Sequence, residues 1–184
     1  MIATWLMVST VQAVPALSGW QVLRDDEVWI GCTWAAGEPW CRAVGRVDAP
    51  VDAVVEQLTD FERYAEVFER IEAVTVLDDD VVQMTLQMPF PLAPRAHAAR
   101  FEVEAMAGVV AVDWQPVEHQ NDTGAVWLPR YAGAWELVPA GEGTEVHFTW
   151  QAELEGDVPD WVLPRAHMRT GSDAMAQLAA ALQR

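Results

Sequence analysis

The sequence contains no lysine, and its eleven basic residues are all arginines, set against 28 aspartates and glutamates and giving a formal net charge of −17. Nucleic acids and anionic membrane surfaces are bound by clustered cations, whereas these arginines are scattered singly among carboxylates. We therefore expect no nucleic-acid partner, and we interpret the acidity as a source of solubility.

Long hydrophobic runs are absent beyond the N-terminus, so we expect no stable membrane insertion. Residues 1–17 are apolar, with small residues at Val11-Gln12-Ala13 and Val14-Pro15-Ala16. This pattern is typical of a secretory signal, although no Lys or Arg precedes it. We expect residues 1–18 to be a signal peptide and the protein to be secreted or periplasmic. The alternative is a buried N-terminal helix, or a misplaced start codon, in a cytoplasmic protein.

Cysteine is scarce, with only Cys32 and Cys41 present. Two cysteines without a nearby histidine pair make an incomplete metal site, so we expect no metal. Gly37 and Pro39 between them mark a turn that can bring them together across a hairpin. Either they form a disulfide, which persists in oxidising compartments, or they are two buried thiols.

Catalytic and cofactor motifs are weak as well. Asp122-Thr123-Gly124 matches the aspartic-protease triplet, but it occurs once, at a position where a hairpin turn is expected. Gly171-Ser172 lacks the frame of a nucleophile elbow. The four histidines show no metal-ligand spacing. We expect no cofactor.

Hydrophobic residues, in contrast, make up 52% of the 184 residues and include ten tryptophans. This length fits one domain with a sizeable core. The aromatic bulk exceeds what a minimal core needs, so part of it can line a pocket.

Strand-like patterns open the chain at residues 20–23, 28–33 and 39–47. Pro50 follows, with Asp48 or Ala49 as the cap of a helix that runs to about Thr59. A second short helix contains Phe61, Tyr64, Val67 and Phe68, an aromatic and apolar stripe that usually packs against a sheet.

From Ile71 the apolar period changes to two, which predicts an antiparallel meander. Its predicted strands cover residues 74–77, 81–88, 100–106, 109–114, 125–138 and 144–154. A long amphipathic helix then runs from about Gly156 to Arg184, with a bend near Pro164 and Gly171. The predicted fold class is α+β, with a curved antiparallel sheet of about six to eight strands, two short helices after the opening strands, and the C-terminal helix packed across the sheet.

This order of elements resembles the helix-grip fold of the START-like (SRPBCC) superfamily. Asp60-Phe61-Glu62-Arg63-Tyr64, followed by Val67 and residues 71–77, is similar to the family's stretch after its first helices. Met88-Pro89-Phe90-Pro91 with Arg95, and Val158-Pro159-Asp160-Trp161-Val162, resemble its motifs before a long strand and before its last helix. The likeness covers about residues 20–184, and we expect residues 19–184 to form one START-like ligand-binding domain. Ala96 and His97 stand where the family usually has an aspartate after the arginine.

The resemblance implies a ligand between the closing helix and the sheet. Apolar and aromatic residues predicted to line this site can equally be plain core. They are Trp114, Tyr131, Trp135, Phe148, Trp150, Met168 and Met175. Arg100 and Arg130 lie in strand-like runs and can meet a polar ligand group if they face inward. An inward arginine would need a partner such as Glu102 or Asp113.

These features favour a monomeric, non-catalytic binder or carrier of a small hydrophobic ligand, whether a lipid, a sterol-like or a polyketide-like molecule. One alternative is a cyclase or hydratase-like enzyme on the same fold, since fold alone does not determine function. Another is an exported structural or interaction domain with a filled core.

Overall fold

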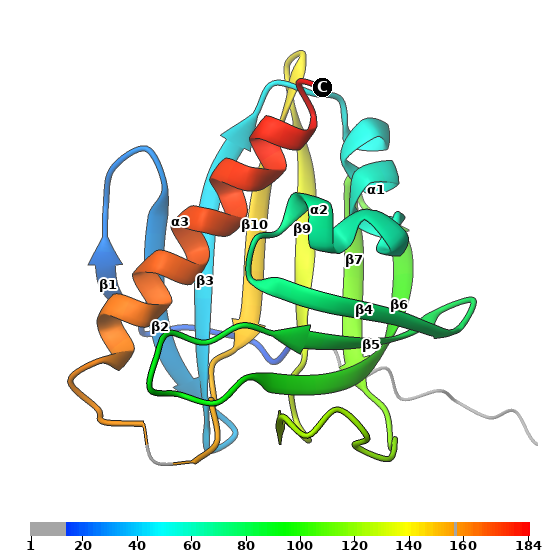
Figure 1. Cartoon of the computed structure of the whole chain (residues 1–184). Helices are drawn as coiled ribbons and strands as arrows, with labels where there is room; N and C mark the ends of the chain where they lie inside the picture. Colours follow the sequence, from blue (N-terminus) through cyan, green and yellow to red (C-terminus); the bar gives the residue numbers. More distant parts are fainter. Residues whose placement is uncertain (1–13, 157) are drawn as a thin grey trace, which may run out of the picture.

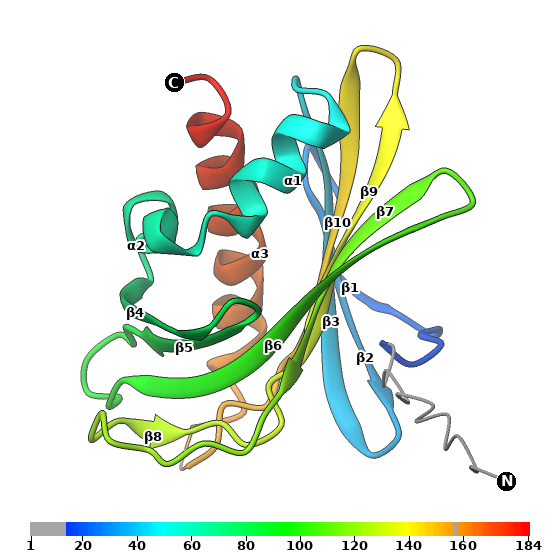
Figure 2. The same cartoon turned by 90° about the vertical axis from the view of Figure 1, so that its right-hand side faces the viewer.

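A computed structural model describes residues 14–156 and 158–184, and in it a strongly curved sheet carries the helices on its concave face (Figures 1 and 2). The predicted signal segment, residues 1–18, lies largely outside the described residues. Among the residues that are described, no helix is long and apolar enough to span a bilayer.

The sheet has ten strands in the described residues, more than the six to eight expected, and its spatial order is β1-β2-β3-β10-β9-β7-β6-β5-β4. These neighbours pair antiparallel, while β8 pairs parallel with β6. The bounds are β1 Gln21–Arg24, β2 Trp29–Ala35, β3 Glu38–Val47, β4 Ile71–Asp78, β5 Val81–Leu86, β6 Arg95–Met106, β7 Val109–Pro116, β8 Val126–Trp127, β9 Gly133–Ala140 and β10 Gly143–Gln151. The predicted fold class is confirmed.

Two strand predictions differ from the structure. Strand β6 begins at Arg95 and not at Arg100. Its first residues are rich in alanine, which has a low strand propensity, so the sequence pattern does not predict a strand there. The predicted run 125–138 is divided into β8 and β9. Pro129 lies between these two strands, where a residue without an N–H cannot donate to a ladder.

The first helices follow β3 closely. Helix α1 spans Val51–Thr59, and Pro50 itself occupies the N-cap. The Pro50 carbonyl accepts hydrogen bonds from the backbone N–H groups of Ala53 and Val54. The predicted caps, Asp48 and Ala49, are therefore one or two residues early. A 3₁₀ turn, η1 (Phe61–Arg63), leads into α2 (Tyr64–Val67).

Helix α3 (Leu163–Ala181) crosses the concave face in front of β2, β3 and β10 (Figure 1). Pro164 lies in its first turn and so begins the helix, where we had expected a bend. Gly171 is buried against the sheet, and a Cβ added there would lie 2.9 Å from the Ala43 side chain and 3.1 Å from Ile30. The glycine thus permits a close approach of helix and sheet.

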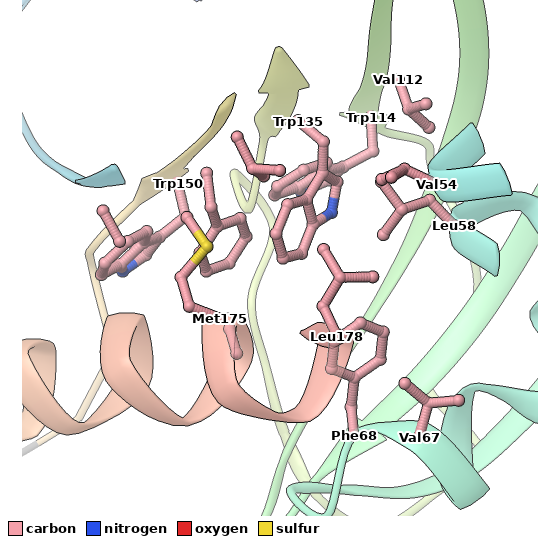
Figure 3. Packing of buried hydrophobic residues seen from close by; sticks show 14 of the residues in the cluster. Val54, Leu58, Val67, Phe68, Val112, Trp114, Trp135, Trp150, Met175 and Leu178 are labelled. Atoms are coloured by element: carbon pink, nitrogen blue, oxygen red, sulfur yellow. The ribbon is translucent and has the colours of Figure 1, made fainter. Parts of the chain in front are cut away.

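The core joins all three helices to the sheet (Figure 3). Val54 and Leu58 of α1 are fully buried, as is Leu178 of α3, and Met175 lies beside Trp150 and Leu178 in the same cluster. The helices therefore pack on the concave face, α1 against β7, β9 and β10 and α3 mainly against β3.

Candidate functional site: an apolar cavity under the C-terminal helix

A cavity of about 310 Å³ lies between α3 and the curved sheet. Its wall comes from α2, from strands β4, β5, β6, β7, β9 and β10, and from the segments around residues 87–92 and 154–162. These two segments and α3 lie on the same side of the molecule in Figure 1. Most of the wall is apolar, and the site therefore suits a hydrophobic molecule.

Aromatic rings of neighbouring strands make the sheet side of this wall. Trp135 and Phe148 are register partners on β9 and β10, and their rings stack with centroids 4.1 Å apart. Phe148 also stacks on Trp150, at 4.7 Å, and on Trp114, at 6.0 Å. Alternation along each strand directs these side chains to the concave face. In Figure 3, Trp114 and Trp135 lie next to each other, and Trp150 lies further along toward Met175.

The α2 side of the wall comes from the aromatic stripe seen in the sequence. Tyr64 and Phe68 line the cavity, with their rings 5.2 Å apart, and Phe68 stacks on Trp135. The Tyr64 hydroxyl donates to the carbonyl of Leu58, and burial raises the pKa of this phenol. Tyr64 is therefore fixed as part of the wall.

Polar groups interrupt the apolar wall at a few points. Burial lowers the pKa of His97 and of His167 to about 4, so both imidazoles are neutral at pH 7. Tyr131 has a pKa raised to about 12 by burial. Arg70 lies 3.8 Å from Asp173 of α3 and donates to Thr170 Oγ1. Desolvation lowers the Arg70 pKa, because burial disfavours its charge.

Arg95 is a buried arginine held by hydrogen bonds to the backbone. Its guanidinium donates to the carbonyls of Ala93, Leu154 and Glu155. These bonds join the segment before β6 to the segment before α3. Both segments line the cavity, so Arg95 acts as a clamp on its wall and not as a free cation.

Five of the residues predicted from the sequence come together in this wall: Trp114, Tyr131, Trp135, Phe148 and Trp150. A direct contact of each with a ligand stays a prediction.

The two predicted methionines are placed elsewhere. Met175 is buried in the core that Figure 3 shows, and Met168 is half-buried outside the cavity lining. The reason is the helical period. The face of α3 toward the cavity carries Ala166, Thr170 and Ala174, which are four residues apart. Met168 and Met175 are seven residues apart and lie together on another face of the helix.

The two predicted arginines also lie outside the cavity lining. Arg100 alternates with inward Phe101 on β6, so it faces solvent and pairs with Asp80 at 2.9 Å, not with Glu102 or Asp113. Arg130 follows Pro129 in the β8–β9 connection and pairs with Glu38 and Glu155, each at 3.3 Å. An exposed pair satisfies a guanidinium at lower cost than burial.

Cys32 and Cys41 are register partners on β2 and β3, and the structure joins them in a disulfide. Of the two alternatives that the sequence left open, the structure therefore has the disulfide and not two buried thiols.

Sequence reasoning missed His97, His167 and Arg70 as lining residues. For His97 a signal existed, since Arg95, His97, Ala99 and Phe101 alternate with smaller or outward residues. Extending β6 by five residues would have placed this histidine on the concave face.

A curved antiparallel sheet, a closing C-terminal helix and an apolar cavity between them together define a START-like helix-grip domain. A family model described as polyketide cyclase / dehydrase and lipid transport matches residues 42–184. The chain belongs to this family, within the START/SRPBCC superfamily. No curated protein matches the sequence.

Solved structures share the fold at low identity. A STAR-related lipid transfer protein from Xanthomonas axonopodis (fragment 25–204) is 22% identical, with a TM-score of 0.79, covering 91% of this chain and 100% of that one. Human StAR-related lipid transfer protein 5 is 16% identical, with a TM-score of 0.76, covering 94% and 89%. The Zhui aromatase/cyclase from Streptomyces is 18% identical, with a TM-score of 0.57, covering 79% and 93%. Identities this low show the fold alone.

Proposed function

We propose that this protein binds and carries a lipid or another small hydrophobic molecule in the cavity beneath α3. The observation that carries the proposal is the cavity of about 310 Å³ whose wall is mostly aromatic and aliphatic. Removing apolar ligand surface from water contributes about 25 cal/mol per Å², before the entropic costs of binding. The family description and the solved lipid transfer proteins support the same class of ligand.

Exchange of the ligand requires movement of the segment 88–94 or of α3. Met88, Pro89 and Leu92 line the cavity, while the neighbouring Phe90 is 96% exposed. The segment has few buried contacts to hold it, which is the property of elements that open locally. Arg95 directly follows this segment and is fixed by hydrogen bonds to three carbonyls, so we expect the chain to stay in place from Arg95 onward.

The cavity histidines are poorly suited to serve as the general base of an enzyme. A general base works best with a pKa near the working pH. His97 and His167 have pKa values of about 4, too low for efficient proton abstraction at neutral pH. The neutral rings suit hydrogen bonding to a ligand better than proton transfer.

We also propose that the protein works in an oxidising compartment, outside the cytoplasm. The Cys32–Cys41 disulfide supports this, because such bridges persist in exported proteins and are rare in reducing cytosol. Measuring the mass of the N-terminus in cells tests the export prediction. A mature chain that begins after about residue 18 is expected, and an intact Met1 would contradict export.

Mass spectrometry of molecules extracted from the purified full chain tests the carrier proposal. We expect an intact hydrophobic molecule in near-stoichiometric amount, and uptake of a fluorescently labelled acyl lipid by the delipidated protein. Turnover of an added polyketide or enone would instead favour the enzyme. Failure to recover or take up any hydrophobic molecule would favour a structural domain with a filled core.

A further inference from the structure

Two ring nitrogens in the cavity wall have no hydrogen-bond partner among the described residues. They are Nδ1 of His97 and Nε1 of Trp114. Both side chains line the cavity, and they are only 2% and 4% exposed. Most buried polar side-chain atoms in folded proteins are paired, and an unpaired one costs about 1–3 kcal/mol. Two such atoms in one cavity therefore need an explanation.

These two side chains lie in one stretch of wall. Trp114 of β7 is the register partner of Phe101 on β6, and His97 precedes Phe101 by four residues on the same face of that strand. The ring of Tyr131 joins them, with its centroid 4.6 Å from His97 and 6.1 Å from Trp114. An imidazole, an indole N–H and a phenol are thus gathered at one place in an otherwise apolar wall.

The chemistry of this set fits a neutral oxygen. The indole N–H of Trp114 only donates, a neutral imidazole donates at one nitrogen and accepts at the other, and a phenol does both. A half rotation of the His97 ring exchanges Nδ1 with Cδ2 and Nε2 with Cε1 without changing the volume of the ring, so the unpaired nitrogen can lie on either side of the ring. An anion is poorly matched to this set, because none of its three side chains, His97, Trp114 and Tyr131, carries a positive charge.

We infer that His97 and Trp114, together with Tyr131, form a hydrogen-bonding site for one hydroxyl or carbonyl oxygen of the bound molecule. The ligand is then a neutral, oxygen-bearing hydrophobic compound, an alcohol or a ketone, whose polar atom lies against this part of the wall. This inference rests on the proposed function, because it names the ligand class of the same cavity.

Matched probes of nearly equal shape test this inference: phenylcyclohexane, 4-phenylcyclohexanone and 4-phenylcyclohexanol. Their affinities for the delipidated full chain are measured by displacement of Nile red, in the wild type and in His97→Leu and Trp114→Phe. The preference is the ratio of the hydrocarbon Kd to the ketone or alcohol Kd. We expect each substitution to lower this ratio about five- to tenfold, as for one buried hydrogen bond. The hydrocarbon Kd of the same variant is the reference, so a general change in the shape of the wall cancels from the ratio.

A nuclear magnetic resonance measurement on the wild type supplies a readout that does not depend on a variant folding. We expect the Trp114 Nε1–H proton to move downfield on adding the ketone and to move less on adding phenylcyclohexane. An unchanged ratio in both variants, together with identical indole shifts for the two probes, would overturn the inference and leave the carrier proposal standing. Binding of none of the three probes would count against both.

Discussion

Gly171 of α3 lies so close to Ala43 of β3 that a Cβ on Gly171 would be 2.9 Å from the Ala43 side chain, with Trp150 only 3.3 Å away. This contact sets the distance of the closing helix from the sheet. It also fixes the middle of the helix beside the ring of Trp150, which lines the cavity. The height of the cavity therefore depends on the absence of a side chain at one position.

Gly171→Val is expected to destabilise the fold by about 2–3 kcal/mol, because the added methyl groups overpack a close helix–sheet contact. Urea unfolding measures the loss. Ala180→Val is a matched control, since Ala180 is exposed on the same helix, and it is expected to change stability by about 0.5 kcal/mol. Equal losses in the free energy of unfolding for the two substitutions would show that the close approach at Gly171 does not contribute to stability.

Removing the disulfide is expected to lower stability without emptying the cavity. The bridge closes a loop with a sequence separation of 9, and the loop-entropy relation gives about 2–3 kcal/mol for a loop of this size. Neither cysteine lines the cavity. We expect the Cys32→Ala/Cys41→Ala double variant to unfold at lower urea yet to bind the same lipids with unchanged affinity. A large loss of affinity in the folded variant would mean that the bridge shapes the site.

The buried His97 is expected to make the protein sensitive to mild acid. Its folded pKa of about 4 lies below the value of about 6.5 in an unfolded chain, so the unfolded state binds more protons between these pH values. The stability contribution is full above pH 6.5 and is lost as the pH falls toward 4. The loss is on the order of 3 kcal/mol.

Urea unfolding of His97→Leu at pH 7.5 and at pH 4.5 checks this expectation. The difference in stability between the two pH values should be smaller in the variant than in the wild type. His119→Leu serves as the control, because His119 is exposed. If His97→Leu and the wild type lose the same stability in acid, His97 is not the group responsible.

Asp113 on the convex face gives the opposite pH dependence. Burial first, and then the charges of Glu104, Glu136 and Glu102, raise its pKa to about 6. For an acid with a raised folded pKa, the folded state binds more protons, so stability is lost as the pH rises from about 4 through about 6.

Asp113→Asn is therefore expected to stabilise the protein by about 1 kcal/mol at pH 7.5, a figure reduced for solvent screening because Asp113 is only half-buried. At pH 4 the substitution should have little effect. Thermal unfolding at both pH values measures this, with exposed Asp79→Asn as the control. A gain of the same size at pH 4 would point to a cause other than charge.

The periodicity of the sequence was enough to predict the sheet, the two short helices and the closing helix. Alternation in residues 144–154 and the aromatic stripe from Phe61 to Phe68 are strong local signals, and both elements formed as expected. The residues of the wall were predictable where a strand was strongly patterned, as for Phe148 and Trp150.

The polar part of the site was not predictable in the same way. His97 lies in an alanine-rich stretch whose strand forms through pairing with β5 and β7, which is a tertiary effect. Met168 and Met175 belong to a helix whose apolar stripe is wider than the row facing the cavity. Deciding which part of that stripe faces the cavity required the position of Gly171 against β3.

The most direct test of the account is to fill the cavity. Ala166 lies on the cavity face of α3, whereas Ala176 is exposed and outside the lining. Titration of a fluorescently labelled acyl lipid into folded Ala166→Phe should show at least about tenfold weaker binding than the wild type, because the ring occupies the space of the ligand, while Ala176→Phe should bind normally. Undiminished binding by Ala166→Phe would contradict the claim that the ligand lies beneath α3.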